Sequence, residues 1–189
     1  MMSQRGVLST DAYQVTMAQL YHRLGLHERR ARFEHFYRSN PDYGEHQAGY
    51  CITAGLGPFI DWMSRTSVTE AEVEALRGHT SRSGDRLFDE AFCRWFTTVD
   101  FGGLQISAVP EGRVVHPNAP ITVVEGPLAE AQLIETPLLN QLNFPTLIAT
   151  KASRVVEVAQ GRPVLEFGMR RGPGAGADAG SRAALVGGA

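Results

Sequence analysis

The sequence has no long hydrophobic run and almost no net charge. No stretch reaches the about 18 consecutive apolar residues that a membrane-spanning helix requires. The formal net charge is −2 at pH 7, so the overall balance favours neither nucleic acid nor an anionic membrane as a partner, and any phosphate site must be built locally. The opening residues, MMSQRGVLSTDAYQ, lack the apolar core of a signal peptide. We therefore expect a cytoplasmic protein.

Cysteines and metal-binding patterns are equally scarce. The two cysteines, Cys51 and Cys93, are too few for a disulfide framework and do not form a CxxC pair, so both are predicted to pack in the core. The six histidines show no HExxH-type or other zinc spacing. His22 and His27 are spaced so that one helix face would not hold both. We expect no metal site from these residues.

Capping residues and apolar spacing predict helices in the first hundred residues. A helix over 12–24 is predicted because apolar residues recur at helical spacing, Ser9, Thr10 or Asp11 can cap it, and Gly25 follows. In SVTEAEVEAL, carboxylates occupy the first turn of a second helix over 69–76, where the helix dipole favours them. DEAFCRWFTTV is expected to form a third helix whose aromatic residues face the core.

Alternating sequences predict short strands between and after these helices. RARFEHFYR, residues 30–38, alternates in side-chain character as a strand does, and NPDYG is typical of a turn. GYCITAGLGPFIDWMSR is expected to contain a short strand, a Gly-Pro break and a helix start. Residues 104–125 combine short β-like runs with turns rich in Pro, Gly and Asn, which predicts a compact β-subdomain.

The character of the sequence changes near residue 128. Residues 128–161 predict two helices broken near Phe144 and Pro145, because proline disfavours helix at the residue before it. VLEFGMR, residues 164–170, predicts a buried strand, followed by a glycine-rich loop and a further helix or turn. This order is typical of the first unit of an α/β barrel or parallel sheet. We divide the chain into an amino-terminal α/β domain, residues 1–127, and the incomplete start of an α/β barrel, residues 128–189.

The end of the predicted strand over 164–170 carries two cations. Arg170 and Arg171 would lie at its carboxyl end, where ligands bind in parallel α/β folds. Planar guanidinium groups suit phosphate or carboxylate, and the glycines that follow would let backbone N–H groups approach an anion. Phe167 could stack on a flat ring. The alternative is that the two arginines lie in an ordinary solvent-exposed turn at the end of the strand, with Phe167 in the core.

Other polar residues also have two interpretations. Asp11 can be a simple helix cap, and Tyr13 can simply pack against its neighbours. Arg38, at the end of the alternating strand, can be an ordinary surface arginine. Lys151 and Arg154 can be solvent-facing charges on the second half of the helical region. Spacing alone leaves these alternatives open.

Taken in order, five segments resemble the amino-terminal part of nicotinate phosphoribosyltransferases. They are TDAYQVTMAQLYHRLG, ARFEHFYRSNP, AGLGPFIDWM, IETPLLNQLNFPTLIATKASRVVEVAQGRPVLEFGMRRG and SRAALVGG. The resemblance spans almost all of the chain, is most specific from Ile134 to Arg171, and covers less than half of a typical family member. It implies a type II phosphoribosyltransferase fold, in which an open-faced α/β domain joins an irregular α/β barrel, active as a homodimer.

The resemblance also implies an activity. The family joins nicotinate to 5-phosphoribosyl 1-diphosphate, giving nicotinate mononucleotide and diphosphate in the salvage of nicotinate into NAD. ATP hydrolysis is coupled through a phosphorylated histidine, and Mg²⁺ usually accompanies the diphosphate. Because the pyridine nitrogen already has a lone pair, the protein's task is to hold it near C1 of the ribose and to stabilise the leaving diphosphate.

Five residues match positions with roles in that family. Tyr13 would stack on the pyridine ring, reaching into the neighbouring subunit's site, and Phe167 would cover the ring's other face. Arg170 would approach the nicotinate carboxylate or the ribose phosphate and serve catalysis. Arg38 would contact phosphoribosyl diphosphate, and Asp11, beside the tyrosine, would have a partly structural role.

The sequence departs from the family pattern in ways that limit the expected activity. No histidine follows His116, so the phosphorylated histidine is not in this chain, and Gly172 stands where alanine is more usual. We expect the 189-residue chain alone not to catalyse the reaction. Two alternatives remain: a non-catalytic truncated fragment, and a relative acting on nicotinamide. The paired arginines of FGMRRG favour nicotinate over nicotinamide.

Overall fold

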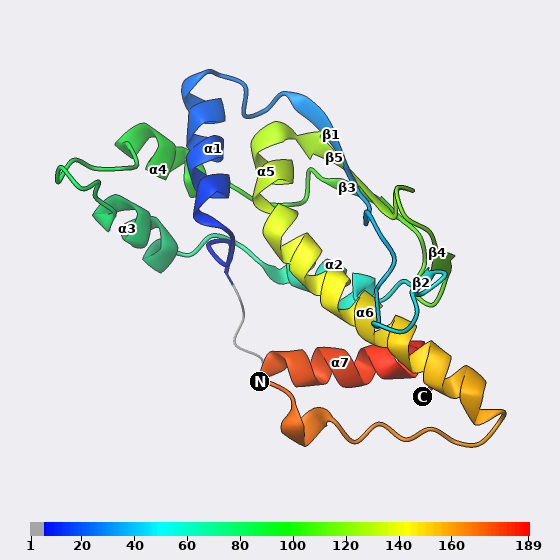
Figure 1. Ribbon diagram of the computed structural model, residues 1–189. Coiled ribbons are helices and arrows are strands. Elements are labelled where there is room, and N and C mark those ends of the chain that lie inside the picture. The colour runs from blue at the N-terminus through cyan, green and yellow to red at the C-terminus, as the bar shows by residue number, and fades with distance from the viewer. Residues whose placement is uncertain (1–5) are drawn as a thin grey trace.

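The computed structural model describes residues 6–189, which form a group of helices beside a small antiparallel sheet and one long diagonal helix (Figure 1). The elements are α1 (Ala12–Arg23), β1 (Arg30–His35), β2 (Cys51–Ile52), α2 (Leu56–Arg65), α3 (Glu70–Gly78), α4 (Glu90–Phe96), β3 (Gln105–Ala108), β4 (Val114–Val115), β5 (Thr122–Pro127), α5 (Leu128–Leu133), α6 (Glu135–Ala159), a 3₁₀ turn η1 (Met169–Arg171) and α7 (Ala175–Val186).

The sheet confirms the strands expected around residues 30 and 104–125. Its order is β1-β5-β3, all antiparallel, and β2 pairs separately with β4. Val124 in the central strand lies opposite Phe33 on one side and Ile106 on the other. Val124 is buried in the main core together with residues of α5 and α6. This register turns one face of the sheet toward α5 and α6. The same face forms one wall of the cavity described below.

Aromatic side chains of the early helices fill the core, as their spacing predicts. Phe59, Phe92 and Phe96 are fully buried. The helix expected over 69–76 forms as α3, and Thr69 and Glu72 make the reciprocal capping box that fixes its start. Both cysteines are buried free thiols, which confirms their packing role.

The rings of His22 and His27 lie close together, although one helix face would not hold both. His27 lies beyond the end of α1, because the chain reverses at Gly25, which has φ +66°. The ring centroids of His22 and His27 are therefore 4.9 Å apart, and both rings contact Trp95. Within the part of the chain that the structure describes, no group of three His, Cys, Asp or Glu side chains is arranged to hold a metal ion. None of the described helices is long and apolar enough to cross a membrane.

The helix break predicted near Phe144 and Pro145 is wrong. The helix α6 continues through Pro145 over 25 residues. Proline costs a helix one hydrogen bond, here the one that would end on the carbonyl of Gln141. Gly55 approaches so closely that a Cβ there would overlap this carbonyl oxygen. The helix continues because tertiary packing on both sides of Pro145 outweighs the local preference.

Threonine hydroxyls on α6 contribute to that packing. The Oγ1 atom of Thr146 accepts from the backbone N–H of Ala54 at 3.2 Å, and that of Thr150 accepts from Ile52 at 2.9 Å. The extended segment from β2 to Gly55 is thus hydrogen-bonded along one side of α6. Hydroxyl groups on the helix thus accept the backbone hydrogen bonds that a neighbouring strand would accept in a sheet.

The strand predicted over 164–170 is also wrong. This stretch is an extended connection without strand pairing that ends in η1. It runs along the far side of α7 from the sheet (Figure 1). Leu165 is 72% exposed and Phe167 68% exposed. A strand requires hydrogen-bonding neighbours, and no strand within residues 6–189 lies beside this segment.

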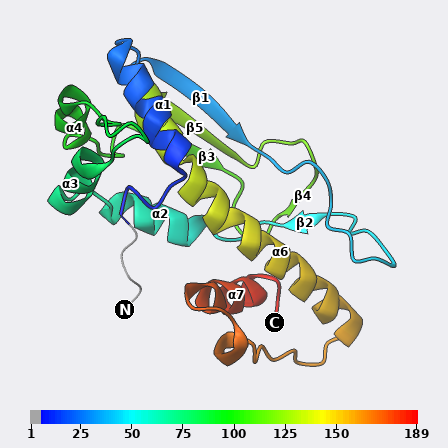
Figure 2. The same cartoon turned by 60° about the vertical axis from the view of Figure 1, so that its left-hand side comes forward.

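Part of the expected glycine-rich loop is helical. The helix α7 begins at Ala175, after Gly174 with φ +47°, and packs against the second half of α6, with Ala183 and Ala149 both buried (Figure 2). Small residues let the two helix backbones approach closely, so the glycine- and alanine-rich composition reflects helix packing at this point.

Candidate functional site

The amino-terminal end of α1 is joined to the junction of α5 and α6 by a buried polar cluster. We call it the Gln14–Glu135 cluster, and it consists of Tyr13, Gln14, Gln132 and Glu135. The Nε2 atom of Gln14 donates to Tyr13 Oη at 2.8 Å and to Glu135 Oε2 at 2.6 Å. Gln132 donates from Nε2 to Gln14 Oε1 and, at 3.1 Å, to Glu135 Oε2. Gln14 is fully buried, so this amide is satisfied entirely within the protein.

The ring of Tyr13 is exposed although its hydroxyl is held. Half of its surface is accessible, while the hydroxyl hydrogen-bonds to the side chains of Gln14 and Glu135. Desolvation and the negative charges of Glu135 and Asp11 raise the pKa of Tyr13, so the phenol is neutral at physiological pH. The side chain therefore offers a neutral aromatic face to solvent.

Asp11 occupies the N-cap position of α1 but makes no capping hydrogen bond from its side chain. Its Oδ2 accepts from the Thr136 hydroxyl at 2.9 Å, and its backbone N–H donates to the same hydroxyl at 3.3 Å. Asp11 thus links α1 to the first turn of α6. This contact fits the structural part of the role that the sequence suggested for it.

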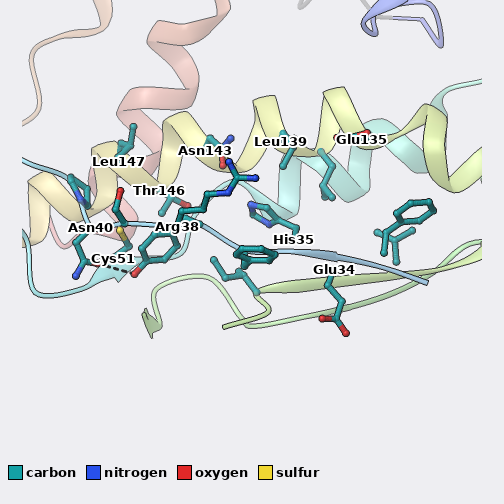
Figure 3. Close-up of a pocket in the computed structure, with 18 of the residues that line it drawn as sticks. Glu34, His35, Arg38, Asn40, Cys51, Glu135, Leu139, Asn143, Thr146 and Leu147 are labelled. Atoms are coloured by element: carbon teal, nitrogen blue, oxygen red, sulfur yellow. Dashed lines mark hydrogen bonds between the residues drawn. The ribbon is translucent and has the colours of Figure 1, made fainter. Parts of the chain in front are cut away.

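A cavity of about 960 Å³ lies between α6 and the chain that runs from β1 to residue 47. Its size suits a small-molecule ligand. Figure 3 shows the helix on one side and β1 on the other, with His35 and Arg38 reaching from the β1 side toward Asn143. Glu135, from the polar cluster described above, lines the same cavity. The cavity therefore extends from the start of α6 to Arg38.

Arg38 is the cation of this cavity. It follows the end of β1, which closes at His35 rather than at residue 38, and its side chain is exposed. Among residues 6–189, Arg38 makes no ion pair. A guanidinium without a carboxylate partner retains its capacity to bind phosphate or another anion.

His35 lies deeper in the cavity wall. Burial lowers the pKa of His35, and a hydrogen bond with Asn143 only partly opposes this effect. Its Nδ1 atom, and Oγ1 of the directly opposing Thr122, are buried without a partner in the described part of the chain. Buried polar atoms of this kind normally meet a water molecule or a ligand. His35 is consequently neutral and available for hydrogen bonding.

Phe167 and Arg170 lie elsewhere. Neither lines the cavity, and both belong to the exposed connection before α7, at the opposite end of the molecule from α1 (Figures 1 and 2). Arg171 is exposed beside them. Within this chain, the five residues singled out from the sequence thus occupy three places: the start of α1, the cavity, and the connection before α7.

The two cations on the second half of α6 have an aromatic partner. Lys151 is exposed, but its Nζ lies 4.2 Å from the ring centroid of Tyr43, and the guanidinium carbon of Arg154 lies 5.6 Å from it. Both distances are typical of cation–π contacts. These contacts hold the loop after Arg38 against α6.

Several residues of the site were missed in the sequence. The cavity lining includes Gln132, Glu135, His35 and Asn143, and Gln14 hydrogen-bonds to Glu135. A signal for Gln14 exists, because it lies on the apolar side of a predicted helix, where a polar residue needs a partner. The partners themselves are more than a hundred residues away along the chain, and spacing does not identify them.

Comparison with known proteins places these features in a family. Residues 8–143 match the family model of the nicotinate phosphoribosyltransferase N-terminal domain. The chain is 41% identical over 182 residues to a nicotinate phosphoribosyltransferase of Bacillus subtilis, covering 96% of this chain and 35% of that protein. It is 38% identical over 183 residues to a nicotinate phosphoribosyltransferase of Arabidopsis thaliana, covering 96% and 31%. The chain thus spans about a third of the length of these curated relatives.

Solved structures agree with the fold. The crystal structure of human nicotinic acid phosphoribosyltransferase superposes with a TM-score of 0.83 at 33% identity, covering 95% of this chain and 35% of that chain. A nicotinate-nucleotide pyrophosphorylase from Pyrococcus furiosus superposes with a TM-score of 0.66 at 23% identity, covering 96% and 36%; that similarity concerns the fold alone. The expected fold class, an amino-terminal α/β part of a type II phosphoribosyltransferase, is confirmed. The domain boundary near residue 128 stays a prediction.

Proposed function

Because the chain belongs to the nicotinate phosphoribosyltransferase family, we propose that it forms the amino-terminal part of an enzyme that joins nicotinate to 5-phosphoribosyl 1-diphosphate in NAD salvage. The observation that carries this proposal is the family match, which includes the TDAYQ segment and extends through the first turns of α6. The products would be nicotinate mononucleotide and diphosphate. A cytoplasmic location and a homodimeric assembly are part of the proposal.

Each site residue has a task that its surroundings support. Tyr13 presents an exposed ring with a fixed hydroxyl, which suits stacking on a pyridine ring. Phe167 is exposed and free to cover the other face of that ring. Arg38 has no ion-pair partner among the described residues and would bind phosphate groups of the phosphoribosyl substrate. Arg170 would bind the nicotinate carboxylate or the ribose phosphate and stabilise charge that develops during transfer.

The separation of these residues supports a site shared between subunits. The start of α1, which carries Tyr13, and the connection before α7, which carries Phe167 and Arg170, lie apart in both views (Figures 1 and 2), so one copy would not enclose a pyridine ring between both aromatic groups. In a dimer, Tyr13 of one copy would meet Phe167 of the other. Asp11 would support this arrangement by anchoring α1 to α6.

ATP and Mg²⁺ belong to the family reaction, and the proposal includes them for the whole enzyme. The described residues form no three-residue cluster that would hold a metal ion by itself, and Mg²⁺ in phosphate-binding sites is commonly held by substrate phosphates with one or two carboxylates. No histidine follows His116 in this chain to carry a phosphoryl group. We therefore assign no step through ATP or Mg²⁺ to side chains of this chain. Its own contribution would be to bind and orient the two substrates.

A chimera tests the proposed function. This chain would replace the corresponding third of the Bacillus subtilis nicotinate phosphoribosyltransferase, and the chimera would be introduced into a strain that depends on nicotinate. We expect the chimera to restore growth and to form nicotinate mononucleotide from nicotinate in vitro. The 189-residue chain alone is expected to do neither, and its sustained turnover would contradict the expectation that this part is inactive by itself. A correctly folded chimera that uses nicotinamide instead would favour the nicotinamide-specific alternative.

A further inference from the structure

The exposed tyrosine at the start of α1 is held in an unusual way. An exposed tyrosine ring is normally free to change rotamer, because nothing fixes its distal end. Here the distal end of Tyr13 is bonded to a fully buried amide, that of Gln14. Half of the side chain's surface is accessible, while its hydroxyl is anchored in the protein.

The anchor is itself held by several hydrogen bonds. Glu135 Oε2 accepts from Gln14 at 2.6 Å and from Gln132 at 3.1 Å, and it lies in the first turn of α6, where the helix dipole favours a carboxylate. Gln132 also donates to Oε1 of Gln14. Both polar ends of the Gln14 amide are therefore used, which leaves it a single orientation.

We propose that Gln14 and Glu135 are positioning residues that fix the ring of Tyr13 in a ready orientation for stacking on a flat ligand. The inference rests on the proposed function for the identity of that ligand, nicotinate. The orientation of the ring is a property of the ligand-free protein and does not depend on the proposed function. A ring ordered in advance loses less conformational entropy when the ligand binds, which improves affinity.

The same arrangement joins two parts of the site. Glu135 lines the cavity that holds Arg38, and it bonds to the amide that holds Tyr13. A ligand group that enters this end of the cavity would meet the carboxylate that orients the ring. The aromatic platform and the anion-binding cavity thus share one side chain.

The first test measures the ring in the ligand-free 189-residue chain. Ring dynamics and titration of the phenol would be followed by NMR with ¹³C-labelled tyrosine, and the Tyr13 signals among the five tyrosines assigned from Tyr13→Phe. We expect an ordered ring in the unchanged protein. Glu135→Gln should free the ring and lower the Tyr13 pKa. Glu74→Gln, which changes an exposed carboxylate of α3, is the matched control and should change neither property.

A second variant guards against misfolding. Tyr13→Phe removes only the hydroxyl of an exposed ring, so the fold should be retained, and the introduced phenyl ring, labelled with ¹³C, should be mobile. The proposal is overturned if Tyr13 in the unchanged chain is as mobile as that phenyl ring, or if Tyr13 is equally ordered in Glu135→Gln.

The last arm uses the chimeric enzyme and separates the two proposals. Tyr13→Phe and Glu135→Gln should each raise KM for nicotinate about 3–10-fold with less than about a twofold change in kcat, and the double variant should resemble Tyr13→Phe alone. Additive effects would contradict action of Glu135 through the tyrosine hydroxyl. An ordered ring in an inactive chimera would leave the positioning role intact and count against the proposed function.

Discussion

Arg182 binds Glu111 through two parallel hydrogen bonds, Nη1 to Oε1 at 2.8 Å and Nη2 to Oε2 at 2.6 Å. The same carboxylate accepts the backbone N–H of Gly55 at 2.5 Å, at the start of α2. One glutamate thus connects α7, the turn before β4 and the amino-terminal end of α2. These contacts fix α7 against the first half of the chain.

Arg182→Gln should destabilise the fold by about 1–2 kcal/mol, because it leaves a half-buried carboxylate without its main partner. Arg182 holds the pKa of Glu111 below its ordinary value of 4.5. The stabilisation is therefore present above that ordinary value and is lost as the pH falls through the lower pKa of the folded state. Urea unfolding between pH 3 and pH 7 would measure both effects.

Arg65→Gln is the matched control for this ion pair. Arg65 pairs with Asp61 on the exposed surface of α2, and such pairs contribute little, so less than about 0.5 kcal/mol should be lost. Equal losses in the two variants would contradict a special role for Arg182 and Glu111.

Gly55→Ala should destabilise the chain by about 2–4 kcal/mol. The residue has φ +101°, and an added methyl group would overlap the carbonyl oxygen of Gln141. Because α6 is fixed by packing on both sides of Pro145, neither backbone can move away without losing contacts. Thermal and urea unfolding of Gly55→Ala and Gly49→Ala would test this, since Gly49 has open space around its Cα and should lose no more than about 0.5 kcal/mol.

Glu130 should make the chain less stable as the pH rises. Burial, and the charges of Asp100 and Glu28, raise the pKa of Glu130 from 4.5 to about 7. The folded state therefore holds a proton that the unfolded state has released between these values, so the contribution of Glu130 to stability is greatest below pH 4.5 and is lost as the pH rises through 7. Because the side chain is only half-buried, we expect a loss of about 1–2 kcal/mol by pH 8.5.

The check for Glu130 compares urea unfolding of the unchanged chain and Glu130→Gln at pH 5 and pH 8.5. The glutamine carries no charge at either pH, so its advantage should appear only at pH 8.5. A constant difference between the two proteins would show that charge at this position has no part in the effect.

Phe167→Ala and Arg170→Gln should separate binding from turnover in the chimeric enzyme. Loss of the aromatic ring should raise KM for nicotinate about tenfold, and loss of the guanidinium should lower kcat about a hundredfold or more. In the 189-residue chain, Phe167 is exposed, so Phe167→Ala should change the free energy of unfolding by less than about 0.5 kcal/mol. Unchanged kcat/KM in either chimeric variant would contradict the assigned roles.

The early elements were predictable because their signals are local. The acidic first turn of the helix expected over 69–76, the glycine after the first helix and the β-like residues from Arg30 depend on residues within a few positions of one another. The corresponding elements form as α3, α1 and β1, although β1 ends at His35 and its exposure does not alternate strictly.

The two wrong predictions concern elements that depend on distant partners. The path of α6 through Pro145 depends on packing against Gly55 and on threonine contacts with residues 52–54. The strand expected over 164–170 needs a neighbouring strand, and none is present beside it among residues 6–189. The apolar residues of this segment are visible in the sequence. Whether another strand lies beside it is not.

The site was predictable to the same extent. The TDAYQ segment and Arg38 could be singled out from the sequence, because their residue types and their family resemblance are visible there. The buried amide of Gln14 and the carboxylate of Glu135 acquire their importance only when α1 meets α6, 121 residues away.

The attachment of the segment from β2 to Gly55 along α6 has a consequence for the order of folding. The hydrogen bond from Ile52 to Thr150 joins residues 98 positions apart, and β1 waits for β5 before it gains any strand partner. Contacts of such high contact order form slowly, because the intervening chain must first be closed into a large loop. Most of this chain will therefore have been synthesised before its sheet can assemble, and during synthesis β1 lacks a strand partner until β5 has emerged from the ribosome.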